Sequence, residues 1–92
     1  MKKVEINGIT YEIVRNDNGC LDKEVLVDKI TDYFDSYDYI VGDYAYEKVR
    51  LKGFYESSNK KAKTINDIKN VSKYIDEYCS YCCRIFIIKK IR

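Results

Sequence analysis

The sequence predicts an α+β fold in the order ββαββαβ, with a mostly antiparallel sheet and both helices on one of its faces. Two runs of alternating polar and apolar residues flank an Asn-Gly pair near the amino terminus. Two later segments repeat apolar residues at helical spacing, and strand-like runs follow each of them. Local hairpins favour antiparallel pairing, and a chain of 92 residues has room for one small domain, residues 1–92.

The first two strands are expected in "VEINGITYEIV", residues 4–14. Asn7 and Gly8 form the pair best able to adopt the positive φ angles of a type I′ turn. We therefore expect a hairpin that turns at these two residues.

The first helix is expected over about residues 22–36, with Asp22 as its N-cap. Its apolar side recurs at the spacing of one helix face and consists of Leu26, Ile30, Tyr33, Phe34 and Tyr37. The opposite side is acidic and carries Asp28, Asp32 and Asp35.

Residues 38–43 and 47–55 are predicted to be the next two strands. In the second of them, Lys48, Arg50, Lys52 and Phe54 alternate with Val49, Leu51, Gly53 and Tyr55. Successive residues of a strand point to opposite faces, so the first set shares one face. We call Lys48, Arg50 and Lys52 the basic row, and expect it on the sheet face that the helices leave open.

The second helix is expected over about residues 65–79, where Thr64 and Asp67 have the spacing of a capping box. Its apolar stripe is Ile68, Val71, Ile75, Tyr78 and Cys79. The run "RIFIIKKI", residues 84–91, has the β-branched and aromatic residues of a last strand. Without the first strand, this order is that of ferredoxin-like folds, which leave one sheet face exposed.

Composition indicates a soluble domain, and the distribution of charge suggests an anionic partner. The longest apolar run, Ile85 to Ile88, is far below the roughly 20 residues that span a bilayer, and residues 4–14 do not resemble a signal-peptide core. We therefore expect a cytoplasmic protein with no membrane association. Residues 16–47 carry a net charge of −7, and residues 48–73 carry +6. Such asymmetry suggests an anionic partner, although solvated faces also carry charge runs.

No catalytic arrangement is recognisable in the sequence. The chain has no histidine, so Ser-His and Cys-His nucleophilic schemes cannot be built within it. It also has no glycine-rich nucleotide motif. Asp32, Asp35, Asp38 and Asp43 could supply carboxylates to Mg²⁺, but no motif fixes them around one point. We expect a non-enzyme without a cofactor.

The cysteines form only half of a metal motif. Cys79 and Cys82 have the C-x-x-C spacing of half a zinc site, whereas tetrahedral zinc needs four ligands and Cys20 lies far away in the sequence. The expected state is therefore packed, reduced thiols with no metal.

The segment "YDYIVGDYAYEKVRLKGFY", residues 37–55, resembles the YutD-like family of low-GC Gram-positive bacteria, in which DYIVGDW precedes LRLKGF. A downstream "EYCSYCC", residues 77–83, resembles the family's EYC-x-x-x-C element. Tyr44 stands where the family tends to have tryptophan, and Cys82 is peculiar to this chain. The resemblance implies a single small domain and no particular reaction. Twelve residues match positions of the family motifs, namely Asp38, Gly42, Asp43, Arg50, Leu51, Lys52, Gly53, Phe54, Glu77, Tyr78, Cys79 and Cys83.

Two functions are compatible with these features. The first is a module that binds RNA or a ribonucleoprotein through the basic row, with Phe54 as a stacking surface and Tyr44 and Tyr46 beside it. The alternative is a protein-interaction module or regulatory adaptor that uses a tyrosine-rich surface. RNA binding predicts a steep dependence on salt, and protein binding predicts a weaker one.

The cysteine pattern predicts that the purified, reduced protein folds without zinc, because four ligands are not arranged as two half-sites. Elemental analysis and unfolding in the presence of a chelator test this expectation. Stoichiometric zinc, together with loss of the fold on chelation, would contradict it.

Overall fold

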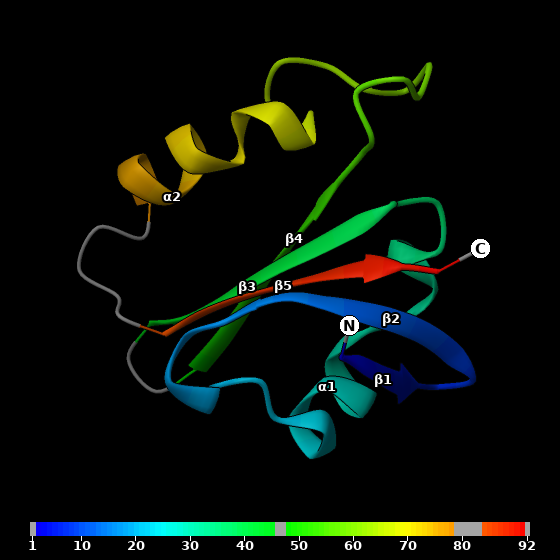
Figure 1. The fold of residues 1–92 in the computed structure, drawn as a ribbon, viewed down its shortest axis with the longest axis vertical. Coiled ribbons are helices and arrows are strands. Elements are labelled where there is room, and N and C mark those ends of the chain that lie inside the picture. Colours follow the sequence, from blue (N-terminus) through cyan, green and yellow to red (C-terminus); the bar gives the residue numbers. More distant parts are fainter. Residues whose placement is uncertain (1, 46–47, 79–83, 92) are drawn as a thin grey trace.

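The structure is a computed structural model that describes residues 2–45, 48–78 and 84–91. Five antiparallel strands form one sheet in the order β1-β2-β5-β3-β4, accompanied by two helices (Figure 1). The predicted α+β fold and its element order are therefore confirmed. The elements are β1 (Lys3–Ile6), β2 (Ile9–Asn16), α1 (Lys23–Lys29), β3 (Tyr39–Ala45), β4 (Lys48–Phe54), α2 (Val71–Tyr78) and β5 (Ile85–Lys90).

The β1–β2 hairpin turns as expected. Asn7 and Gly8 have φ angles of 53° and 83°, which is the conformation of a type I′ turn. The Asn7 amide also donates hydrogen bonds to the carbonyls of Val27 (3.0 Å) and Ile30 (3.1 Å). These bonds satisfy carbonyl groups at the end of α1 and attach the helix to the hairpin.

The two helices cover opposite faces of the sheet, so the prediction that they share one face is wrong. On one face, Phe86 and Ile88 pack with Leu26 of α1. On the other face, Ile85 and Ile87 pack with residues of α2. Figure 1 shows α1 beside β1 and α2 beyond β4. The physical reason lies in β5, which is buried at four consecutive positions and therefore needs cover on both sides.

The strand order also differs from the ferredoxin-like expectation. β5 pairs with β2 on one side and with β3 on the other, which leaves β1 and β4 as the two edges of the sheet. The basic row therefore lies on an edge strand, on the face that α2 partly covers, and not on a face without a helix.

Both helices are shorter than predicted. Asp22 caps α1 by accepting from the Glu24 amide (3.0 Å), as expected, but the helix ends at Lys29 because Ile30 is extended (φ −86°, ψ 105°). A 3₁₀ turn, Asp32–Phe34, follows and still buries the Phe34 ring.

The second helix begins with a 3₁₀ turn, Ile68–Asn70, and the expected capping box does not form. Asp67 is the N-cap and accepts from the Lys69 amide (3.0 Å), whereas Thr64 contributes only its carbonyl, which accepts from the Asn70 side chain (3.0 Å). The hydroxyl of Ser57 donates to Asp67 (2.6 Å), and this bond lowers the pKa of the carboxyl group.

Two glycines in the strands are each covered by an aromatic ring. A Cβ atom on Gly42 would lie 2.0 Å from Cζ of Phe86, and one on Gly53 would lie 2.3 Å from Cγ of Tyr37. Neither distance is compatible with any side chain larger than hydrogen. These contacts place the rings directly on the sheet and give the two glycines of the family motif a steric role.

Gly42→Ala should destabilise the fold by about 1–3 kcal/mol, because the added methyl group overpacks against Phe86. Urea unfolding measures this cost. In a Phe86→Leu background the same substitution should cost less, since the clashing ring is absent. Equal costs in the two backgrounds would show that the contact is not responsible.

Candidate functional site

The basic row points to the α2 side of β4, together with Phe54. Lys48 is exposed, Lys52 is half-buried, and the Arg50 side chain is 50% exposed. Lys48 and Arg50 are thus exposed, whereas Lys52 is partly covered.

Arg50 forms an ion pair with Asp43, which lies directly opposite it in the β3–β4 register. The guanidinium Nε and Nη2 atoms donate to the two carboxylate oxygens at 3.2 and 2.5 Å. The Asp43 side chain is only 2% exposed, so this bidentate bond balances a buried charge. Arg50 therefore stabilises the sheet, and its charge is largely balanced within the chain.

Phe54 is fully buried, so the prediction that it offers a stacking surface to RNA is wrong. Its ring packs edge-to-face against Tyr74 of α2, with the centroids 5.5 Å apart. Lys52 lies over the same two rings, with Nζ 5.5 Å from the Phe54 centroid and 5.7 Å from that of Tyr74. The ring beside the basic row that is not fully buried is thus that of Tyr74. Because Tyr74 lies on α2, the pattern of the strand gave no sign of it.

Tyr44 lies away from the basic row, on the α1 face of the sheet. Its hydroxyl donates to the Cys20 carbonyl at 2.9 Å, and Arg84 lies 4.7 Å above its ring. Burial raises the pKa of this tyrosine. The predicted grouping of Tyr44 with the basic row is therefore not found, and Tyr46 lies outside the described residues.

Asp38 of the family motif holds a turn in place. One of its carboxylate oxygens accepts from the Glu56 amide (2.9 Å) and from the Asn59 side chain (3.0 Å). Asp38 is 7% exposed, which suits a structural role.

Cys79 and Cys83 lie outside the described residues. Within residues 2–45, 48–78 and 84–91, no group of His, Cys, Asp or Glu side chains is arranged to hold a metal ion.

The loop between β4 and α2 returns to the end of β4. The Tyr55 amide donates to the Asn66 carbonyl (2.7 Å), and the Ile68 amide donates to the Tyr55 carbonyl (2.9 Å). This closure positions Thr64 and Ile65 next to Lys52, where they line a cavity between β4 and α2.

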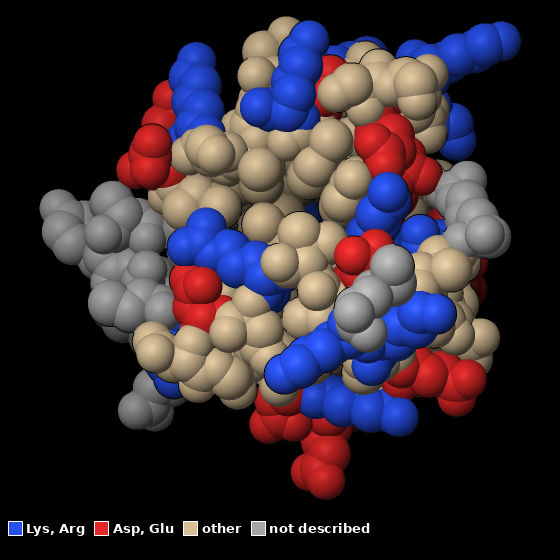
Figure 2. Space-filling view, viewed as in Figure 1, with Lys and Arg blue, Asp and Glu red and all other residues tan. Residues whose placement is uncertain are grey.

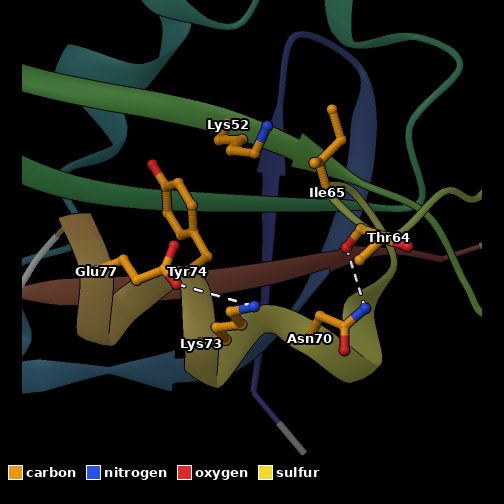
Figure 3. A pocket seen from close by; sticks show the side chains of 7 residues that line it. All are labelled: Lys52, Thr64, Ile65, Asn70, Lys73, Tyr74 and Glu77. Atoms are coloured by element: carbon orange, nitrogen blue, oxygen red, sulfur yellow. Dashed lines mark hydrogen bonds and ion pairs between the residues drawn. The ribbon is translucent and has the colours of Figure 1, made fainter.

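That cavity has a volume of about 460 Å³. Figure 3 shows Lys52 and Tyr74 facing each other from β4 and α2, with Ile65 at one end and the Lys73–Glu77 pair on the helix. Ile65 is 73% exposed and lines this cavity. The cavity thus combines apolar, aromatic and cationic groups.

A second cavity of about 370 Å³ adjoins the first, since Lys52 and Tyr74 line both. Its other lining residues are Tyr33, Tyr37, Arg50, Leu51 and Gly53. We call the two cavities together the β4 groove.

The tyrosines of the second cavity form a stack beside β4. Tyr37 lies over Tyr55, with ring centroids 4.7 Å apart, and its hydroxyl is 3.4 Å from that of Tyr33. The hydrogen bond with Tyr33 raises the pKa of Tyr37 to about 12. Tyr33 is 68% exposed, although its helical spacing predicted a core position. The break in the helix after Lys29 explains the difference, because it changes the direction in which residue 33 points.

Lysines surround one end of the groove. Lys60, Lys61, Lys63, Lys69 and Lys73 are all exposed on α2 or on the loop before it. In Figure 2, basic side chains lie at this end of the molecule with acidic ones among them, and further basic side chains lie towards the opposite end. The exposed lysines therefore add positive charge around this end of the groove.

A family model described as "Putative antitoxin YutD-like" matches residues 5–89. The chain belongs to the YutD-like family. It is 38% identical to "Putative antitoxin YutD" of Bacillus subtilis (strain 168) over 87 residues, which is 95% of this chain and 96% of that relative. The solution NMR structure of B. subtilis yutD superposes with a TM-score of 0.79 at 36% identity, covering 100% of this chain and 84% of that one. The YutD-like resemblance of residues 37–55 is thus confirmed.

In the described part of the chain, neither helix has the length and apolar character needed to span a membrane.

The raised pKa of Tyr37 predicts a loss of stability in alkaline solution. Because the folded state favours the neutral phenol, this contribution is complete below the ordinary value of 10.0 and disappears as the pH rises through about 12. Tyr37→Phe removes the ionising group, so its stability in urea should fall less over this pH range than that of the parent. Identical pH profiles would contradict the assignment.

Proposed function

We propose that this protein is a non-catalytic module that binds a protein partner through the β4 groove and thereby regulates that partner. Under this proposal, residues 1–92 act as one domain in the cytoplasm. The description of the family and of its B. subtilis relative as antitoxins supports a protein that acts by binding another molecule.

The observation that carries the proposal is the composition of the groove. Exposed apolar and aromatic side chains, Ile65 and Tyr33, lie beside the cations Lys52 and Lys73 around adjoining cavities. Aromatic residues and a mixture of apolar centre and polar rim are typical of protein interfaces. A partner that covers this surface would bury Ile65 and Tyr33 and gain about 25 cal/mol for each Å² of apolar surface removed from water.

RNA binding through the basic row is a second candidate, and the separation of charge between residues 16–47 and 48–73 favours it. Its support is weaker, because Phe54 is buried and Arg50 is bound to Asp43. Lys48 and Lys52 would be left to contact phosphates, with Tyr74 as the nearby ring.

Charge reversal in the groove separates the two candidates. A Lys52→Glu, Lys73→Glu variant and a matched Lys60→Glu, Lys61→Glu variant change the net charge equally, but only the first pair lines the groove. The parent and the matched variant should capture the same proteins from cell lysate, and the groove variant should capture at least about tenfold less of them. Nuclease should not release these proteins.

Release by nuclease would favour RNA, and equal loss with both variants would indicate only general attraction by charge.

Ile65→Ser and Val14→Ser provide an uncharged comparison, because both remove an exposed apolar side chain and only Ile65 lines the groove. Urea unfolding of each variant confirms that the fold is retained.

A further inference from the structure

We infer that the partner fills the groove with an extended segment of alternating acidic and apolar residues, which pairs with the outer edge of β4 as an additional strand. This inference rests on the proposed function and specifies the chemistry and conformation of the bound segment.

The outer edge of β4 is available for pairing. β4 is the last strand in the sheet order, and no strand in the described ranges pairs with its outer edge. It has seven residues, whereas the opposite edge strand, β1, has four. A long edge strand presents a row of backbone groups that can accept another strand.

The second cavity opens at this edge. Four consecutive residues of β4 line it, from Arg50 to Gly53. Because successive residues of a strand point to opposite faces, a cavity that touches all four has to reach around the edge of the strand. The cavity therefore lies where the backbone of an added strand would run.

The side chains of β4 specify the pattern of the added strand. The basic row lies on one face, and Val49 and Leu51 lie on the other, where Tyr37 covers Gly53. Cross-strand neighbours on the same face interact most strongly when their charges are opposite or when both are apolar. Every second residue advances about 6.6 Å on both strands, so acidic side chains at alternate positions would match the spacing of the basic row, and every second one of them would lie beside Lys48 or Lys52.

The same charges argue against a second copy of this chain as the occupant. Pairing β4 with β4 of another copy would oppose two basic rows, and like charges directly opposite each other destabilise a sheet. Lysines on edge strands commonly prevent such self-association. A strand with acidic residues would meet no such repulsion.

Binding of a synthetic peptide tests the inference. The probe is a fluorescently labelled peptide of about eight residues with alternating glutamate and valine, and its affinity is measured by anisotropy. Two further peptides carry N-methyl groups on all glutamates or on all valines. Alternate amides of a strand point to opposite edges, so only one set of methyl groups should meet β4. One methylated peptide should bind like the parent peptide, and the other should bind at least about tenfold more weakly.

Matched controls test the pattern and the charges. A peptide with the same residues in two blocks, and one with lysine in place of glutamate, should bind at least about tenfold more weakly than the alternating peptide. Binding of the alternating peptide should be lost in the variant with Lys48→Glu and Lys52→Glu. It should be retained in the matched variant with Lys60→Glu and Lys61→Glu. A single-stranded RNA should not displace it.

Equal binding of the two methylated peptides, or of the block peptide, would overturn strand pairing, and so would displacement by RNA. Failure of every peptide to bind would also overturn the inference. In each case the capture experiment with the groove variants still decides the proposed function separately.

Discussion

The ion pair between Asp43 and Arg50 connects the fold with its candidate site. A carboxylate that is 2% exposed needs a hydrogen-bonded counter-charge, and the residue directly opposite it in the β3–β4 register supplies one. In the register that places Arg50 opposite Asp43, every second residue of β4 lies on the face of Arg50. Lys48 and Lys52 consequently lie beside Arg50 on the α2 side, and Gly53 turns toward Tyr37 on the other side. The basic character of the strand is therefore partly a requirement of the sheet itself.

The position of β5 accounts for the remaining architecture. This strand lies in the middle of the sheet and is buried on both faces, so α1 and α2 are needed on opposite sides. β4 is left at an edge, with α2 and its preceding loop beside it. The helix has eight residues and does not close the space over Lys52 and Tyr74, which leaves the β4 groove open to a partner.

Local patterns predicted the local structure well. The Asn7-Gly8 turn, the Asp22 cap and the alternation along β4 follow from backbone preferences of a few adjacent residues. The arrangement of the helices depends on long-range packing, although the uninterrupted apolar run of β5 was a signal for two covered faces. The burial of Phe54 and the exposure of Tyr33 could not be predicted from their own segments, because each depends on where α2 begins and α1 ends. The roles of Tyr46, Cys79 and Cys83 stay predictions.

The central claim is that the outer edge of β4 is open and forms part of the binding surface. Amide hydrogen exchange of the isolated protein, resolved residue by residue by NMR, tests this most directly. Amides of β4 that point to β3 should be protected, and those between them should exchange rapidly, so that fast and slow exchange alternate from Lys48 to Phe54. Uniform protection along the strand would contradict the account, since it would mean that the edge is already paired in the isolated protein.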